Sequence, residues 1–316
     1  MEDPSAEQKK REQAVVAAIE AIRAGEVSES RVTRLSDLSR EGARSLATAW
    51  ATIPEATRED LVKRFEELTE DRLDLDFGRA LRVAIGDTSP VVRQLAVSAL
   101  WEDESRDVLD RLHTLFTDDP SPDVRAAAAA GLERFAERAV AGDLSGEETE
   151  RLQSELLGAA SDERSPYIVR RRALEALGPL AGSAPVRHLI TDAYESGDHG
   201  LQCSAIYAMG RSLDSRWLPI ILAELEGEEP ELRFEAARAA GALGAPDALP
   251  VLLAAAADED AEVRHMAISA IGRIGGKGAV RALERLAEDA GEADLELIEA
   301  ALDEANLMLE PFRDSS

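Results

Sequence analysis

The chain contains few cysteines, few lysines and few aromatic residues, and it has no long apolar run. Its one cysteine, Cys203, excludes an internal disulfide and fits a reducing compartment. Aromatic residues make up only 4% of the sequence while alanine is abundant, which is unusual for a β-sandwich or barrel and favours thin, closely packed helices. No stretch approaches the roughly eighteen apolar residues of a membrane span, and the charged N-terminus lacks the apolar segment of a signal peptide. We therefore expect an all-α, soluble, cytoplasmic protein without a membrane partner.

Positive charge is also scarce. The sequence has 63 acidic and 36 basic residues, which give a formal net charge of −27. A field of this sign repels phosphate backbones and anionic membrane surfaces, so nucleic acid is not an expected partner. Two explanations of the acidity remain open at this point: a salty cytoplasm in which charge maintains solubility, or a basic partner.

The sequence does contain an internal repeat. An apolar residue, usually followed by Arg, returns six times, and positions 93, 125, 170, 202, 233 and 264 lie 32, 45, 32, 31 and 31 residues apart. If this Arg is position zero, position +3 is Ala in every unit, and positions −1, +4 and +7 are apolar or Ala. At about 100° per residue these positions share one arc, which predicts an amphipathic helix in each unit. The pairs are Val92-Arg93, Val124-Arg125, Val169-Arg170, Leu201-Gln202, Leu232-Arg233 and Val263-Arg264.

Capping signals delimit these helices. Ser-Pro pairs at 89–90, 121–122 and 165–166 place a hydroxyl before a proline at the expected helix start. Glycines at the expected helix ends predict C-caps at Gly178, Gly210, Gly244 and Gly275. A second amphipathic segment precedes each helix, for example at 107–117, 184–195, 216–225 and 246–257. Each unit is therefore predicted to be a helical hairpin.

The consensus Asp-x-(Ser/Asp)-Pro-x-Val-Arg-x-x-Ala-x-x-Ala-Leu resembles the HEAT repeat in its short form, which is shared with the HEAT-like repeats of phycobilin lyases. Residues 119–125 and 258–264 match it best. The resemblance covers about residues 76–290 and implies an α-solenoid, a superhelix of about six hairpins. It departs at Gln202, which replaces the Arg, and at the 45-residue step, where residues 137–150 are expected to form an extended helix end and a loop.

The regions outside the repeat are predicted to cap it. Residues 1–75 do not follow the repeat positions, although 31–51 and 57–70 have helical periodicity, and we expect a helical N-terminal cap region there. Residues 291–310 keep the apolar positions but lose the Arg, as expected for a C-terminal capping helix. A disordered tail is predicted for 311–316.

The repeated Arg lies inside the apolar arc and is therefore expected to be partly buried, which requires carboxylate or carbonyl partners. Candidate partners recur in the preceding turn at Asp87, Asp119, Glu229 and Asp258. We interpret the Arg as a structural ladder that connects adjacent units, because a residue repeated in every unit suits architecture better than catalysis. The ladder residues are Arg93, Arg125, Arg170, Arg233 and Arg264.

A binding site is expected on the face that the second helices present. In HEAT-like arrays the second helices of the hairpins line the concave side, and by this resemblance they are the ones that carry the repeat. Two interpretations remain open: the Arg side chains there balance local acid and the rings pack on neighbours, or the face binds an acidic or aromatic peptide segment. The candidate residues are Arg171, Tyr207, Arg211, Phe234, Arg238, His265 and Arg273.

No catalytic motif accompanies this face. Deoxyhypusine hydroxylase, a di-iron enzyme on a HEAT-like scaffold, needs repeated His-Glu dyads, whereas the four histidines here are followed by Thr, Leu, Gly and Met. His199 and Cys203 lie one helical turn apart, but two ligands do not make a metal site. We therefore expect a non-catalytic scaffold or adaptor with a protein or peptide partner and no cofactor. The alternatives are a bilin lyase or lyase subunit, and a regulatory subunit of a partner enzyme; the oligomeric state stays open.

Overall fold

The structure is a computed structural model that describes residues 4–289 and 291–307. In these residues it contains eighteen α-helices, four short 3-10 helices and no strand, so the predicted all-α fold class is confirmed. None of the described helices is both long and apolar enough to cross a bilayer. The tail predicted at 311–316 lies outside the described residues. The helices are α1 (Pro4–Arg23), α2 (Glu29–Val32), α3 (Arg40–Trp50), α4 (Glu55–Asp71), α5 (Gly78–Ala84), α6 (Pro90–Ala99), α7 (Arg106–Asp118), α8 (Pro122–Ala141), α9 (Gly146–Ser161), α10 (Tyr167–Ala176), α11 (Ala184–Glu195), α12 (His199–Arg211), α13 (Leu218–Leu225), α14 (Pro230–Leu243), α15 (Leu249–Ala255), α16 (Ala261–Ile274), α17 (Gly276–Asp289) and α18 (Glu292–Leu307), with 3-10 helices at Thr33–Leu35, Gly178–Leu180, Ser215–Trp217 and Pro246–Ala248.

The helices pack into two units, residues 1–135 (unit 1) and residues 136–316 (unit 2). The expected boundaries near 75 and 290 stay predictions. Within unit 1, α4 of the expected N-terminal cap region packs directly on α6, which carries the first repeat positions. Within unit 2, α18 packs on α16 in the same way.

The repeat positions form the core of the hairpins. The alanine at position +3 is fully buried in all six repeats, which lie on α6, α8, α10, α12, α14 and α16. Positions −1 and +7 are buried as well, with the larger side chains Val92, Leu132 and Ile271 among them. The apolar stripe predicted from the sequence is therefore the face of each helix that is buried in the core. The fold is the HEAT-like solenoid arrangement of stacked hairpins.

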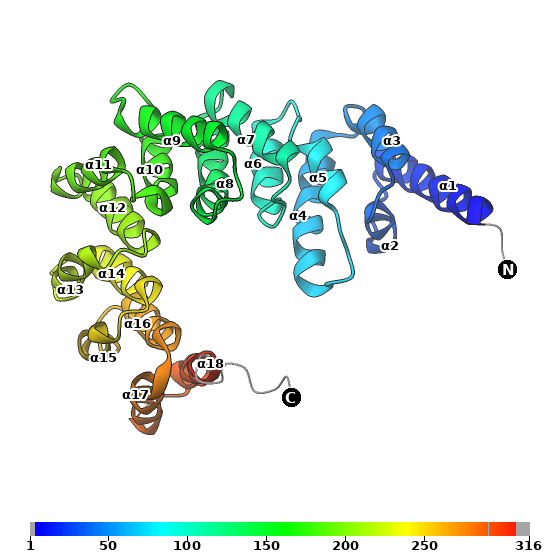
Figure 1. The fold of residues 1–316 in the computed structure, drawn as a ribbon. Coiled ribbons are helices and arrows are strands. Elements are labelled where there is room, and N and C mark those ends of the chain that lie inside the picture. Colours follow the sequence, from blue (N-terminus) through cyan, green and yellow to red (C-terminus); the bar gives the residue numbers. More distant parts are fainter. Residues whose placement is uncertain (1–3, 290, 308–316) are drawn as a thin grey trace, which may run out of the picture. The chain divides into compact units, whose positions relative to one another are not determined.

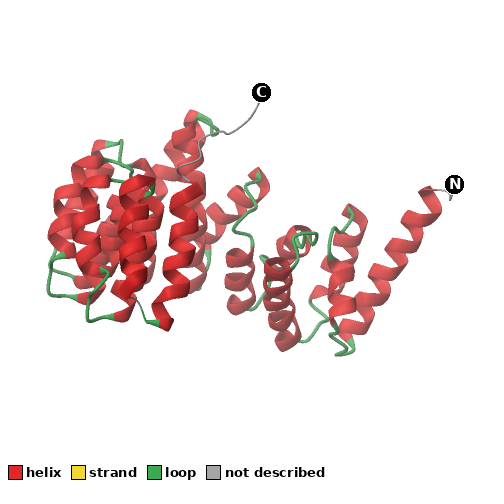
Figure 2. Ribbon diagram, turned by 90° about the horizontal axis from the view of Figure 1, so that it is seen from below, coloured by secondary structure: helices red, strands yellow, loops and turns green. Residues whose placement is uncertain are grey.

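Unit 2 has two layers of helices. Successive second helices α10, α12, α14, α16 and α18 pack on one another and form what we call the inner layer, while α11, α13, α15 and α17 lie on the other side (Figure 1). Short loops join neighbouring helices at both ends of the helices (Figure 2). The inner layer is the part of unit 2 that presents the predicted binding residues.

Two of the four predicted glycine C-caps are wrong. Gly244 and Gly275 do end helices with positive φ values of 58° and 66°. Gly210 instead lies inside α12, where a Cβ would stand 2.6 Å from the Cα of Ala239 on α14. Gly178 likewise begins a 3-10 helix, and a Cβ there would be 2.8 Å from the carbonyl oxygen of Ala208. These positions require glycine because the next inner-layer helix touches their backbone, and not because the chain turns there.

The 45-residue step contains a longer helix, a loop and the start of a further helix. Helix α8 extends to Ala141, and Gly142 then takes a φ of 86°. Helix α9 begins behind a capping box in which the Ser145 side chain accepts from the Glu148 backbone and the Glu148 side chain accepts from the Ser145 backbone. The extra residues thus lengthen the second helix of one hairpin and supply the first turn of the next hairpin.

Candidate protein-binding site

The ladder arginines join hairpins, but through a different partner from the one expected. Arg93 on α6 donates from Nε and Nη2 to the Asp119 carboxylate at 2.7 and 2.8 Å, and Arg233 on α14 does the same to Asp258 at 2.8 and 2.9 Å. The side-chain partner is therefore the Asp of the following turn, whereas the sequence pointed to the preceding one. The preceding turn contributes backbone: Arg93 Nη1 donates to the carbonyl of Asp87 at 2.8 Å.

The geometry explains why the turn needs an aspartate. In each of these turns the same carboxylate also accepts a backbone N–H two residues on, from Ser121 to Asp119 at 2.8 Å and from Asp260 to Asp258 at 2.9 Å. One carboxylate thus fixes its own turn and binds the guanidinium of the previous hairpin. Because a planar guanidinium and a carboxylate match at two points, Lys could not replace Arg here.

The other three ladder arginines make only part of this arrangement. Arg264 donates to the carbonyls of Asp258 and Glu259 at 2.9 and 3.2 Å, and Arg125 Nε donates to the carbonyl of Phe116 at 2.9 Å. The Nε of Arg170 is buried without a hydrogen-bond partner. Arg125 and Arg264 therefore bond backbone carbonyls near the hairpin turn, and among the five predicted ladder arginines the two-point contact with a carboxylate is seen at Arg93 and Arg233.

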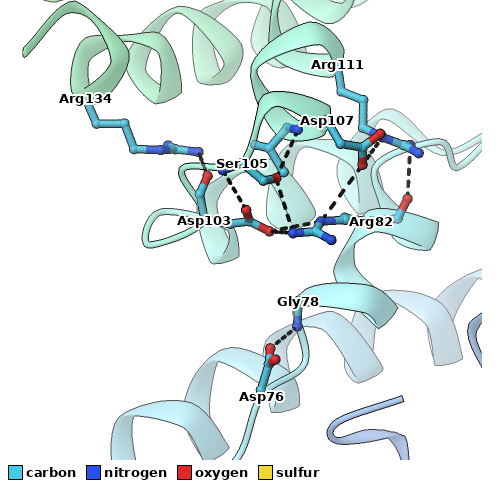
Figure 3. A network of polar contacts seen from close by, with 9 residues as sticks. Asp76, Gly78, Arg82, Asp103, Ser105, Asp107, Arg111 and Arg134 are labelled. Atoms are coloured by element: carbon cyan, nitrogen blue, oxygen red, sulfur yellow. Dashed lines mark hydrogen bonds and ion pairs between the residues drawn. The ribbon is translucent and has the colours of Figure 1, made fainter. Parts of the chain in front are cut away.

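A second polar network stacks the hairpins of unit 1 (Figure 3). Arg82 on α5 donates to Asp103 at 2.9 Å and to Ser105 at 3.2 Å in the loop before α7. Arg111 on α7 donates back to the carbonyl of Arg82 at 3.1 Å, and Arg134 on α8 donates to the carbonyl of Asp103 at 3.1 Å. Burial of Asp103 acts to raise the pKa of its carboxyl, but hydrogen bonds from Ser105 and Arg82 outweigh burial and lower it. We read this network as architecture, like the ladder.

The centre of the inner layer of unit 2 holds a cluster of rings around one arginine. The Arg238 guanidinium carbon on α14 lies 4.2 Å from the centroid of the Tyr207 ring on α12 and 5.9 Å from that of Phe234. Arg238 also forms an ion pair with Glu235 one turn earlier. All four side chains are partly exposed. The structure therefore brings together three of the predicted residues, from two adjacent helices, at one place on the inner layer.

Two carboxylates lie beside these rings. Glu175 on α10 is buried and accepts from Ser204 at 2.7 Å and from Arg172 at 2.6 Å, while Arg171 donates to the Ser204 hydroxyl at 3.0 Å. Burial raises the pKa of the Glu235 carboxyl despite the opposing effect of Arg238, and the nearby Glu175 charge adds to the rise. We call the set of Arg171, Glu175, Ser204, Tyr207, Phe234, Glu235 and Arg238 the inner-face cluster.

The remaining predicted residues do not join this cluster in one group. Arg211 forms an ion pair with Glu137 of α8, and His265 lies 3.0 Å from an Asp294 oxygen on α18. Arg273 near the end of α16 is exposed. Arg171, Arg211 and Arg238 each form an ion pair with a carboxylate of this chain.

Several residues of the site were missed or misjudged from the sequence. Ser204 and Glu235, which were not among the candidate residues, lie two residues after the repeat positions 202 and 233. Tyr167 on α10 hydrogen-bonds Asp198, and its ring lies 6.0 Å from the Arg171 guanidinium. Cys203, which precedes Ser204 on α12, is only 8% exposed. The signal that could have found Glu175 and Glu235 is their spacing, four and three residues from Arg171 and Arg238 on the same helices.

The described residues contain no group of three or more His, Cys, Asp and Glu side chains arranged to hold a metal ion. His199 and Cys203 do lie close, with 4.0 Å between the ring nitrogen and the sulfur, and His199 is 3.8 Å from Glu231. The inner-face cluster therefore offers rings, a hydroxyl and opposed charges, which are groups suited to binding a protein surface.

The stacked hairpins, with a buried alanine at one position and an Arg–Asp contact between turns, define an α-solenoid protein. Comparison with family models identifies the repeat: residues 79–146 and 218–303 match the model for HEAT repeats. The chain therefore contains HEAT repeats in these two segments. This confirms the resemblance inferred from the Val-Arg pattern.

Individual proteins with similar sequence or fold are distant. Deoxyhypusine hydroxylase of Drosophila melanogaster is 33% identical over 92 residues, which are 28% of this chain and 30% of that protein. The complex of CpcE and CpcF of phycocyanin lyase from Nostoc sp. PCC7120 has a TM-score of 0.53 at 17% identity and covers 85% of this chain and 95% of that chain. Human deoxyhypusine hydroxylase is 21% identical, covers 95% of this chain and 98% of that chain, and has a TM-score of 0.31. Of these, the similarity to the CpcE–CpcF complex supports the fold of the chain.

Proposed function

We propose that the protein is a non-catalytic cytoplasmic adaptor that binds a protein or peptide segment on the inner layer of unit 2. The observation that carries this proposal is the convergence of Tyr207 and Phe234 on Arg238, from two adjacent helices. Half-buried aromatic and Arg side chains that are held in place before binding are the typical anchors of protein interfaces. Repeat proteins with such stacked hairpins commonly use these extended surfaces for binding.

The charge of the cluster favours an acidic or aromatic segment. In the inner-face cluster, Arg171 and Arg238 contribute two positive charges and Glu175 and Glu235 contribute two negative ones, so the formal charge of the cluster is zero. This neutral patch lies in a chain whose formal charge is −27. An acidic side chain of a partner would therefore meet less repulsion here than over the chain as a whole, and its aromatic neighbours could stack on the rings.

The test uses a matched pair of tyrosines. Peptides selected from a random twelve-residue library for binding to the unmodified protein are measured against Tyr207→Ala and against Tyr194→Ala, which changes a partly exposed tyrosine on the opposite layer. We expect Tyr207→Ala to weaken binding by about ten-fold or more, as for an interface anchor, and Tyr194→Ala to have little effect. Equal weakening by both variants, or none by Tyr207→Ala in a folded protein, would sink the proposal.

Replacing Arg211 and Arg238 with Glu would be a poor test of peptide binding. Both arginines already pair with carboxylates of the protein, Glu137 and Glu235. Replacing them with Glu would place like charges together and disturb the inner layer itself. The aromatic substitution removes a binding surface without breaking an ion pair.

The alternative functions are separated by activity assays. The similarity to the phycocyanin lyase complex concerns the fold alone, so a bilin lyase or lyase subunit would rest on analogy. Attachment of a bilin to a phycocyanin apoprotein, measured by absorbance in the presence and absence of this protein, would support that alternative. A regulatory subunit would instead change the rate of its partner enzyme after that partner is identified.

A further inference from the structure

A cavity lies between two consecutive hairpins of unit 2, away from the inner-face cluster. Its volume is about 460 Å³, and the turn after α13 and helix α15 with its following turn line it. Leu225, Val251, Ala254 and Ala255 are its apolar lining, which we call the floor, and Glu226 and Glu259 line it with carboxylates, which we call the rim. Both rim carboxylates belong to exposed residues. We call this the turn cavity.

The one arginine that lines the turn cavity is already engaged. Arg233 donates to both oxygens of Asp258, and its Nη1 donates to the carbonyls of Gly227 and Glu228 at 3.1 and 2.7 Å. This arrangement holds the pKa of the Asp258 carboxyl below its usual range. Arg233 therefore serves the ladder and points its donors at the protein, not at the rim.

The surroundings of the turn cavity are acidic on both sides. The turn before α14 also carries exposed Glu228 and Glu229, and the turn before α16 leads to exposed Glu262. Arg264 adds one positive charge beside the rim, because its Nη1 donates to the carbonyls of Asp258 and Glu259. The carboxylates of the two turns outnumber it and leave negative charge in excess, and charges within about 10 Å act together at moderate ionic strength. A ligand with a cationic head and an apolar part for the floor suits this cavity.

We propose that the turn cavity receives the side chain of a lysine or arginine from a basic segment of a partner protein. These side chains combine an apolar stem, which can lie on the floor of Leu225, Val251 and Ala254, with a cationic head that can reach Glu226 and Glu259. The neighbouring carboxylates attract further basic residues of the same segment. This site is separate from the inner layer and takes a partner of the opposite charge preference.

Binding is tested with a fluorescein-labelled twelve-residue peptide of alternating lysine and serine, by fluorescence anisotropy with the full chain. The rim variant is Glu226→Gln with Glu259→Gln. The matched control is Glu147→Gln with Glu150→Gln on α9, which removes the same charge from exposed positions elsewhere in unit 2. We expect the rim variant to weaken binding by ten-fold or more and the control by less than two-fold.

A second pair of variants tests the cavity without changing charge. Ala254→Leu places a larger side chain into the floor, and Ala223→Leu makes the same change at an exposed alanine 31 residues earlier, on α13. We expect Ala254→Leu to weaken peptide binding at least five-fold and Ala223→Leu to leave it unchanged. Tyr207→Ala should also leave it unchanged, which separates this site from the inner-face cluster.

Three results would overturn the proposal. Equal weakening by the rim and control variants would mean a general attraction to an acidic protein. Loss of binding in the rim variant without an effect of Ala254→Leu would place the peptide on the turns and not in the cavity. Absence of measurable peptide binding to the unmodified protein at low salt would remove the site altogether.

Discussion

Arg58 and Asp87 form a buried two-point ion pair between consecutive hairpins of unit 1. Arg58 Nε and Nη2 donate to the two Asp87 oxygens at 2.6 and 3.1 Å, and the Trp50 indole donates to the same carboxylate at 2.6 Å. The side chains are 7% and 1% exposed. Arg58 also donates to the carbonyl of Ile53, five residues earlier, as Arg93 does to that of Thr88. Arg58 is thus a ladder residue in a region where the sequence pattern showed none.

The first prediction concerns Asp87→Ala. The substitution leaves the buried Arg58 guanidinium and the Trp50 N–H without their acceptor, and removing one partner of a buried pair costs about 3–5 kcal/mol. Urea unfolding followed by circular dichroism measures the loss. The control is Asp74→Ala, which breaks the exposed Arg72–Asp74 pair and should leave the free energy of unfolding nearly unchanged. Equal effects of the two substitutions would contradict the role assigned to Asp87.

The second prediction is the acid dependence of stability. Burial acts to raise the pKa of Asp87, but hydrogen bonds from Arg58, the Ser89 N–H and Trp50 outweigh it, so the pKa in the folded protein is lowered. The unfolded chain then binds the proton more readily. The stability that the carboxylate contributes is complete above its ordinary value of 3.8 and is lost as the pH falls through the folded pKa.

We therefore expect the urea midpoint to fall steeply below about pH 4 in the unmodified protein and less steeply in Asp87→Asn. The comparison is made over a series of pH values at constant ionic strength. Parallel curves for the two proteins would show that Asp87 does not titrate in this range.

The third prediction concerns the close approach of α12 and α14. An alanine at Gly210 would place its Cβ 2.6 Å from the Cα of Ala239, which real structures do not tolerate, so the helices must separate. We expect Gly210→Ala to destabilise unit 2 by about 1–3 kcal/mol, as overpacking does. Thermal unfolding of the full chain, followed at two wavelengths, gives the change in midpoint.

The control for that substitution is Gly158→Ala on α9. No atom lies within 4 Å of a Cβ built there, and the residue is helical, so the alanine should stabilise the protein by about 0.4–1 kcal/mol. The two glycines thus predict opposite signs from the same chemical change. A stabilising Gly210→Ala would mean that the inner layer can open at no cost.

The fourth prediction concerns the reactivity of Cys203 at the inner layer. Burial, with a smaller effect of the Glu235 charge, raises the pKa of the thiol to about 11. The thiolate is the reactive form, so an aromatic disulfide reagent at pH 8 should react at least ten-fold more slowly with the folded protein than with urea-unfolded protein. The unfolded protein should consume one equivalent, since the sequence has one cysteine. Equal rates in the two states would contradict the burial of Cys203.

Most of the fold was predicted from the repeat positions, and particular residues show which features these positions did not predict. Ala96 and Ala267 were correctly assigned to the core because burial follows from helical periodicity alone. Gly210 was taken for a C-cap because a glycine that ends a helix and one that touches a neighbouring helix look alike in a sequence.

The binding face shows the same division. The positions of Tyr207, Phe234 and Arg238 on adjacent second helices follow from the repeat, which fixes which residues share a face. That Arg238 lies over Tyr207 and also pairs with Glu235 depends on how closely α12 and α14 approach. The turn cavity between residues 225 and 259 likewise has no signal in the sequence beyond its carboxylates.

The sequence by itself determined the helices, the pairing of helices into hairpins and the stripe that each hairpin buries, because these depend on local periodicity and on short turns. Only the tertiary structure decided which Asp each ladder arginine binds, as Arg93 shows by pairing with Asp119 of the next turn. It also decided which surface arginines are already neutralised. These contacts join residues 25 to 29 positions apart, and their geometry is set by the stacking of one hairpin on the next.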